Sequence, residues 1–218
     1  MKTSFDSFVA LIRELSVEEQ EALVDSDNRP ALKQFLVKLQ FLLTPVGTIK
    51  VLPTEKFSAS DFFKVNTAKN ASVKTSHLGD NFKAWFLGKT KERTSASEAV
   101  PGDGPYRTPG ATEVALRYYT LNKRSVDGPI IAQLGGVAKA ETETSLAEIA
   151  ACLQKQASGE PGMLLTNGYA NIFYVRDSVW ALRAVNVDWY GDGWSVYADS
   201  VEHPNDWSAG SRVFSRDS

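Results

Sequence analysis

Tight-turn signals recur through the last third of the chain and constrain its fold more than any other feature. Asn167-Gly168 is the strongest short-range hairpin signal, because both residues accept the positive φ angles of a two-residue turn. Asp177-Ser178 and Gly191-Asp192 are further turn signals between runs of alternating apolar and polar residues. Together they predict an antiparallel β-meander with strands at residues 163–166, 169–176, 179–190 and 194–201.

The last hairpin has a predictable register. With Gly191 and Asp192 as the two loop residues, one face of the hairpin becomes consistently apolar, whereas a three-residue loop would mix the two faces. The apolar face then pairs Trp189 with Trp194, Val187 with Val196, and Val185 with Ala198. The opposite face pairs Asp188 with Ser195, Asn186 with Tyr197, and Ala184 with Asp199.

Two helix starts precede the meander. Ser145 and Glu148 have the spacing of a capping box, in which each side chain accepts from a free backbone N–H of the other residue. They predict a helix over 145–157, and its apolar face is expected to pack on the sheet. Asp127-Gly128-Pro129 predicts a second, short buried helix that ends at Gly135-Gly136.

Helical periodicity dominates the N-terminal part. Apolar side chains recur at helical spacing over 1–43, which predicts a helical segment. Residues 44–88 are predicted to be a mixed α/β segment, with a strand at 46–52 and a helix at 81–87 that begins after Asp80. In 89–112, twelve of the 24 residues are Gly, Pro, Ser or Thr, so a flexible linker or mobile loop is expected there.

These elements predict an α+β fold. It would consist of an N-terminal helical segment and an α+β domain over 113–218, in which the antiparallel β-meander packs against one or two helices. The 113–218 part has a length that can fold alone.

Charge and composition exclude several classes of function. The net charge is −2, and residues 113–218 carry nine Lys or Arg against thirteen Asp or Glu, so a nucleic-acid partner is not expected. No secretory signal or membrane span is evident, and the single Cys152 fits a reducing compartment, so we expect a cytoplasmic protein without a membrane partner. With two histidines and one cysteine, neither a metal nor another cofactor is expected.

Acidic and tryptophan residues concentrate in one C-terminal segment. Residues 184–211 contain five carboxylates and three tryptophans, but no Lys or Arg. Carboxylates can bind sugar hydroxyls and indoles can stack on sugar rings, which suggests a carbohydrate site. The candidate ligand-binding residues are Trp194, Trp207, Asp192, Asp199 and Glu202. The competing interpretation is that the tryptophans belong to the core and the carboxylates to solvated turns.

Catalytic constellations are missing from the sequence. Asp188 and Asp199 lie four strand positions apart in the predicted register, about 13 Å, which exceeds the separation used by a glycosidase pair. No G-x-S-x-G motif occurs, and Cys152 sits among apolar residues as a buried structural thiol would. A non-enzymatic binding or protein-interaction module is therefore favoured, with another protein or a second copy of the chain as its partner. A carbohydrate-binding or carbohydrate-active protein is the alternative.

Four motifs give the chain a family resemblance. They lie at residues 78–87, 125–131, 167–177 and 212–216. With them, most of residues 65–218 resembles a family of small, uncharacterised bacterial proteins that have no assigned activity. The resemblance implies a bacterial, intracellular protein and supplies no catalytic or binding residue.

Overall fold

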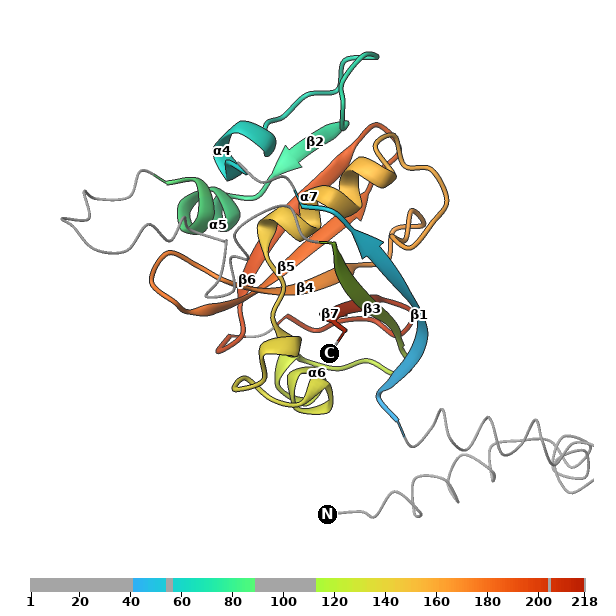
Figure 1. The fold of residues 1–218 in the computed structure, drawn as a ribbon, viewed down its shortest axis with the longest axis vertical. Coiled ribbons are helices and arrows are strands. Elements are labelled where there is room, and N and C mark those ends of the chain that lie inside the picture. Colours follow the sequence, from blue (N-terminus) through green and yellow to red (C-terminus); the bar gives the residue numbers. More distant parts are fainter. Residues whose placement is uncertain (1–40, 54–56, 89–112, 204, 218) are drawn as a thin grey trace, which may run out of the picture. The chain divides into compact units, whose positions relative to one another are not determined.

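A seven-stranded mixed sheet forms the centre of the fold in this computed structural model, which describes residues 41–53, 57–88, 113–203 and 205–217 (Figure 1). The strand order is β1-β3-β7-β4-β5-β6-β2. The strands are β1 Leu43–Val51, β2 Thr75–Leu78, β3 Val114–Leu121, β4 Asn171–Arg176, β5 Leu182–Trp189, β6 Trp194–Ser200 and β7 Arg212–Arg216. The predicted α+β class is confirmed.

The chain divides between Leu42 and Leu43 into two units, and the strands and helices described here belong to the second. Residues 1–40 of the predicted helical segment and the whole predicted linker at 89–112 lie outside the described residues. Leu43, the last residue of that helical segment, already belongs to β1. Strands β1 and β2, from the 44–88 segment, join strands from 113–218 in one sheet.

The predicted meander is wrong as a description of the whole sheet. Strands β4, β5 and β6 are consecutive antiparallel neighbours, and β5 and β6 pair in the predicted register, with Trp189 opposite Trp194 and Asp188 opposite Ser195. However, β7 pairs with β4 in parallel and β2 pairs with β6 in parallel. These pairings join segments far apart in sequence, which turn signals between neighbouring strands cannot reveal.

The predicted first strand of the meander, at 163–166, does not form because side chains bind its backbone groups. The Gln156 amide accepts from Leu164 N at 2.7 Å and donates to Leu164 O at 3.1 Å. The Asn171 amide does the same for Leu165, at 2.7 and 3.0 Å. With these groups satisfied by amides, the segment has no need of a strand partner.

Short helices lie around the sheet. They are α4 Ala59–Phe62, α5 Asp80–Phe82 continuing into a π-helical turn Lys83–Leu87, α6 Asp127–Leu134, a 3₁₀ turn Ala140–Thr142, and α7 Leu146–Lys155. The predicted capping box of α7 is present, with Ser145 and Glu148 bonded reciprocally. Gly135 ends α6 in the left-handed conformation at φ 119°, as the predicted glycine stop requires.

Helix α7 covers one face of the sheet. Ile149, Cys152 and Leu153 are fully buried and belong to a single apolar core with strand residues of the same face. Those strand residues are Phe173, Val185, Val187, Trp194, Val196 and Phe214. Phe173 and Phe214 stack at a centroid distance of 4.3 Å. The predicted packing of this helix on the sheet is thus observed.

The other face of β4 is covered through a buried polar contact. Asp127, in the first turn of α6, is fully buried, and its Oδ1 accepts from Tyr174 Oη at 2.9 Å and from Trp207 Nε1 at 2.8 Å. These bonds join α6, β4 and the segment between β6 and β7. Asp127 Oδ2 is buried without a hydrogen-bond partner among the described residues.

A buried ion pair ties α7 to β7. Glu148 accepts from Ser145 N through Oε2 and from Arg216 Nε through Oε1, each at 2.8 Å, and the residue is 1% exposed. We expect Glu148→Ala to lower the free energy of unfolding by about 3 kcal/mol, because it removes the carboxylate that pairs with the largely buried Arg216 side chain and removes a cap from the helix. Urea denaturation followed by circular dichroism measures this change.

Glu113→Ala is the matched control. Glu113 forms its ion pair with Lys50 at 2.8 Å, but both side chains are more than half exposed. Water solvates both groups after the change, so the unfolding midpoint should hardly move. Equal losses in the two variants would contradict the assignment of the Glu148 pair as a structural tie.

Candidate functional site

The two tryptophans predicted to bind a ligand are both buried. Trp194 is fully buried beneath α7, donates from Nε1 to Gln156 O at 2.8 Å, and packs edge-on against Trp189 at 5.2 Å between centroids. Trp207 is 5% exposed, and its Nε1 donates to Asp127. Neither indole presents a face on which a sugar ring could stack.

The three predicted carboxylates do not form one cluster. Asp192 is exposed in the β5–β6 turn, and Glu202 is exposed in the turn after β6. Asp199, on β6, is partly buried and lines a pocket. Within the described part of the chain, no group of three or more His, Cys, Asp and Glu side chains is arranged to hold a metal ion. Of the five predicted site residues, the pocket therefore includes only Asp199.

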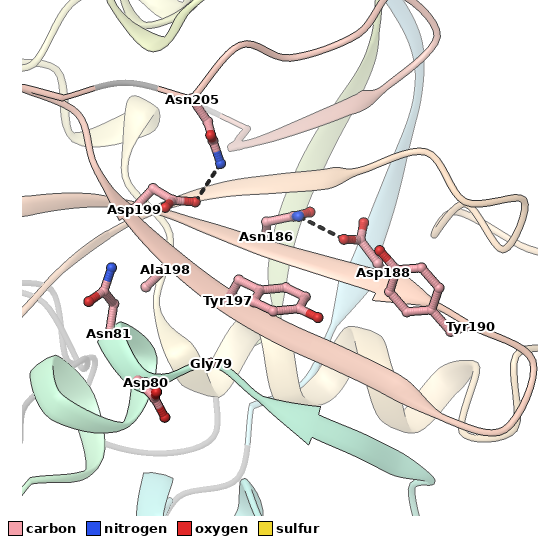
Figure 2. A pocket seen from close by; sticks show the side chains of 10 residues that line it. All are labelled: Gly79, Asp80, Asn81, Asn186, Asp188, Tyr190, Tyr197, Ala198, Asp199 and Asn205. Carbon is pink, nitrogen blue, oxygen red and sulfur yellow. Dashed lines mark hydrogen bonds between the residues drawn. The ribbon is translucent and has the colours of Figure 1, made fainter.

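The pocket lies on the face of β5 and β6 that is opposite α7 (Figure 2). Its volume is about 430 Å³. Asn186 and Asp188 come from β5 and Tyr197 and Asp199 from β6, because side chains alternate between the two faces of a strand. The full lining is Gly79, Asp80, Asn81, Asn186, Asp188, Tyr190, Tyr197, Ala198, Asp199 and Asn205.

Residues 79–81 form a further part of the pocket lining, and the parallel pairing of β2 with β6 positions them there. Gly79 N donates to Val196 O at 2.8 Å directly after β2 ends, so the first residues of α5 lie beside the pocket. A Cβ at position 79 would lie 2.9 Å from Cδ1 of Tyr197. Glycine therefore allows the chain to pass close to the Tyr197 ring.

Two buried oxygen atoms in the pocket lining have no partner. Asn186 Nδ2 donates to Asp188 Oδ2 at 2.8 Å, and this bond leaves Asn186 Oδ1 and Asp188 Oδ1 without a hydrogen bond among the described residues. Asn186 is 8% and Asp188 6% exposed. A buried acceptor without a donor costs about 1–3 kcal/mol, so these atoms favour any ligand that brings a donor.

Burial also changes how the pocket carboxylates titrate. Desolvation raises the pKa of Asp188 to about 6, against the opposing effect of the Asn186 hydrogen bond. Desolvation likewise raises the pKa of Asp199, while a 2.8 Å hydrogen bond from Asn205 lowers it. The charge of Asp188 raises the pKa of Tyr190, and Figure 2 shows the Tyr190 side chain beside that carboxylate.

The lining contains three carboxylates and no Lys, Arg or His. Asp80 is paired with Lys83 at 2.6 Å, which also lowers the pKa of the Asp80 carboxyl. Asp188 and Asp199 have no ion-pair partner among the described residues. Such a site repels phosphates and carboxylates and accepts hydrogen-bond donors or cations.

Cys152 does not offer a reactive nucleophile. It is fully buried in α7, and burial raises the pKa of its thiol to about 12. The thiol therefore stays protonated at neutral pH, whereas the thiolate is the nucleophile.

Asn186, Asp188 and Tyr197 are site residues that sequence reasoning did not select. The predicted register already placed them on the polar face of the hairpin, and a run of polar residues on one face of a central strand was the available signal. The contributions of residues 79–81 and Asn205 had no such signal, because they depend on the β2–β6 pairing and on the return of the chain after β6.

No protein-family model, curated protein or solved structure matches this chain. Across the described residues, none of the helices has the length and apolar character needed to cross a membrane.

Asp188→Asn should stabilise the protein at neutral pH. The folded-state pKa of about 6 exceeds the ordinary 3.8, so the stability that Asp188 contributes falls as pH rises from about 4 to about 6 and stays low above that range. We expect the free energy of unfolding of the variant to exceed that of the unchanged protein by about 1–3 kcal/mol at pH 7.5 and by little at pH 4. Urea unfolding measures this difference.

Asp192→Asn is the control for this comparison, because it makes the same change at an exposed turn position outside the pocket. Its unfolding free energy should follow that of the unchanged protein at both pH values. A less stable Asp188→Asn variant at pH 7.5 would show that the Asp188 carboxylate is stabilising and would overturn this interpretation.

Proposed function

We propose that the protein is a non-enzymatic binding protein whose pocket on the β5–β6 face takes a small ligand that donates hydrogen bonds. The observation that carries the proposal is the pair of buried, unpartnered oxygens of Asn186 and Asp188 in the pocket lining. A folded protein retains such unfavourable groups chiefly where a function uses them.

The positions of the carboxylates support a binding role over a catalytic one. Asp199 pairs with Ala184, four residues before Asp188 on β5. This offset corresponds to about 13 Å along the strand, whereas glycosidase pairs are separated by about 5–9.5 Å. The two carboxylates therefore provide two separate binding positions within the pocket.

A carbohydrate is the second candidate ligand. Tyr190 is 60% exposed and lines the pocket together with Tyr197, so aromatic rings, carboxylates and amides lie together as in sugar-binding sites. In this proposal the tyrosines, and not the predicted tryptophans, provide the stacking surface.

A protein-interaction role based on the 1–43 segment stays a prediction, because residues 1–40 lie outside the described part. The exposed side chains of Val179 and Trp180, in the β4–β5 turn, are a further feature that a protein partner could contact. Trp180 has a φ of 66°, which is rare for a tryptophan.

Gly79→Ala tests whether the pocket binds ligands. The added Cβ should displace the Tyr197 ring and weaken binding by about tenfold, which corresponds to about 1.4 kcal/mol. We suggest titrating the full chain with glucose, cellobiose, agmatine and 4-amino-1-butanol while recording amide NMR spectra. At least one probe should shift the signals of residues 79–81, 186–190 and 197–199 in a saturable way.

Gly128→Ala is the matched control, since a Cβ at that position in α6 meets nothing within 4 Å. Its binding should equal that of the unchanged protein. The proposal fails if none of the four probes shifts the pocket signals. Conversion of cellobiose to glucose would contradict its non-enzymatic part.

A further inference from the structure

We propose that the natural ligand of this pocket is an organic cation, which places a primary ammonium or guanidinium group against Asp188 and beside the rings of Tyr190 and Tyr197. This inference rests on the proposed binding function and narrows its ligand to one chemical class.

The charge of the pocket is not compensated by the described part of the protein. Lys83 pairs with Asp80, but no described Lys or Arg pairs with Asp188 or Asp199. A fourth carboxylate, Asp127, lies close enough to Asp199 for their charges to interact. A ligand cation would supply the missing positive charge, whereas a neutral sugar would leave Asp188 buried and unpaired.

The two unpartnered atoms in the pocket lining are both acceptors. Asp188 Oδ1 and Asn186 Oδ1 each need a donor, and the Nδ2 group of Asn186 is already bonded to Asp188 Oδ2. An ammonium group has three donors and a guanidinium group five, and neither has an acceptor that would remain unsatisfied here. A hydroxyl group offers one donor and adds lone pairs to a site that is already rich in them.

Two aromatic rings complete the site. Figure 2 shows the side chains of Tyr197 and Tyr190 on the same side of the pocket as the Asp188 carboxylate. A cation close to the face of a tyrosine ring gains about 0.5–2 kcal/mol, depending on how far it is desolvated. Tyr190 is 60% exposed, so its ring is accessible to a ligand from solution.

An inorganic cation fits this arrangement less well. The described residues contain no group of three or more His, Cys, Asp and Glu side chains arranged for a metal ion. Asp188 and Asp199 are offset by about 13 Å along their strands, so they cannot ligate the same ion, whose oxygen ligands lie at about 2.0–2.6 Å. A ligand cation with a short organic body fills the pocket and contacts more of its lining.

Binding of such a ligand should depend on pH. Asp188 binds a cation only when ionised, so affinity should fall below a pH of about 6. The titratable groups that line the pocket together with Asp188 are Tyr190 after β5, Tyr197 and Asp199 on β6, and Asp80 on α5. His77 on β2 lies 5.3 Å from the Tyr197 ring. A positive charge on His77 would also lower the affinity for a cationic ligand, as protonation of Asp188 does.

Calorimetric titration of the full chain at pH 7.5 and 5.0 tests the inference. The probes are agmatine and 4-amino-1-butanol, with 1,4-butanediol as the neutral match and cellobiose as the sugar. We expect both cations to bind and butanediol not to bind. Agmatine affinity should fall about tenfold at pH 5.0, because about one tenth of Asp188 is then ionised. His77→Gln should retain this fall.

Asp188→Asn keeps the size and fold of the site but removes its charge. It should weaken agmatine binding at least tenfold at pH 7.5 and remove most of the fall in affinity between pH 7.5 and 5.0, while Asp192→Asn should bind as the unchanged protein does. Circular dichroism confirms that both variants are folded.

Three results would overturn the inference. If cellobiose binds and the cations do not, the ligand is a carbohydrate and the proposed binding function still holds. If Asp188→Asn binds agmatine as tightly as the unchanged protein, the cation does not sit at Asp188. If none of the cationic and neutral probes binds, the proposed binding function falls together with the cation assignment.

Discussion

Burial of the central strands on both faces is the constraint on which the rest of the structure depends. One face of β4, β5 and β6 is covered by α7 with an apolar core that includes Phe173, Val187 and Trp194. No second long helix covers the other face among the described residues. On that face, β4 is covered by contacts with α6 and Trp207, whereas the pocket lies over β5 and β6.

Over β4, the second face is closed by the buried carboxylate of Asp127, whose Oδ1 accepts two hydrogen bonds, from Tyr174 and Trp207, while its Oδ2 is unpartnered. On β5, the buried carboxylate of Asp188 accepts a single hydrogen bond, from Asn186, and its Oδ1 is unpartnered. Both acids are almost inaccessible, so burial disfavours both charges. Of these two acids, Asp188 lines the pocket described above, where a ligand can supply a hydrogen-bond donor.

Sequence patterns correctly predicted the features that depend on residues close together in the chain. The capping box of Ser145 and Glu148, the glycine stop at Gly135 and the β5–β6 register all follow from residues close in the chain. The pairing of β7 with β4 and of β2 with β6 depends on segments far apart, and no local pattern encodes it. The site was mispredicted for the same reason, because the burial of its tryptophans depends on contacts between distant segments. Tryptophan beside acid suggested a sugar site, but Trp194 is buried against the end of α7, and Trp207 is buried with its Nε1 bonded to Asp127.

The pocket exists because local and distant pairings meet at one place. The local hairpin puts Asn186 and Asp188 opposite Ser195 and Tyr197, and the distant β2–β6 pairing then brings Gly79 against the Tyr197 ring. Strand β2 extends the sheet beside β6, and residues 79–81 directly after it join the pocket lining. Burial withdraws water from Asp188, and among the described residues only the bond from Asn186 replaces the lost hydrogen bonds. The fold thus keeps a carboxylate with too few hydrogen-bond donors, and a ligand that brings a donor would compensate for the lost solvation.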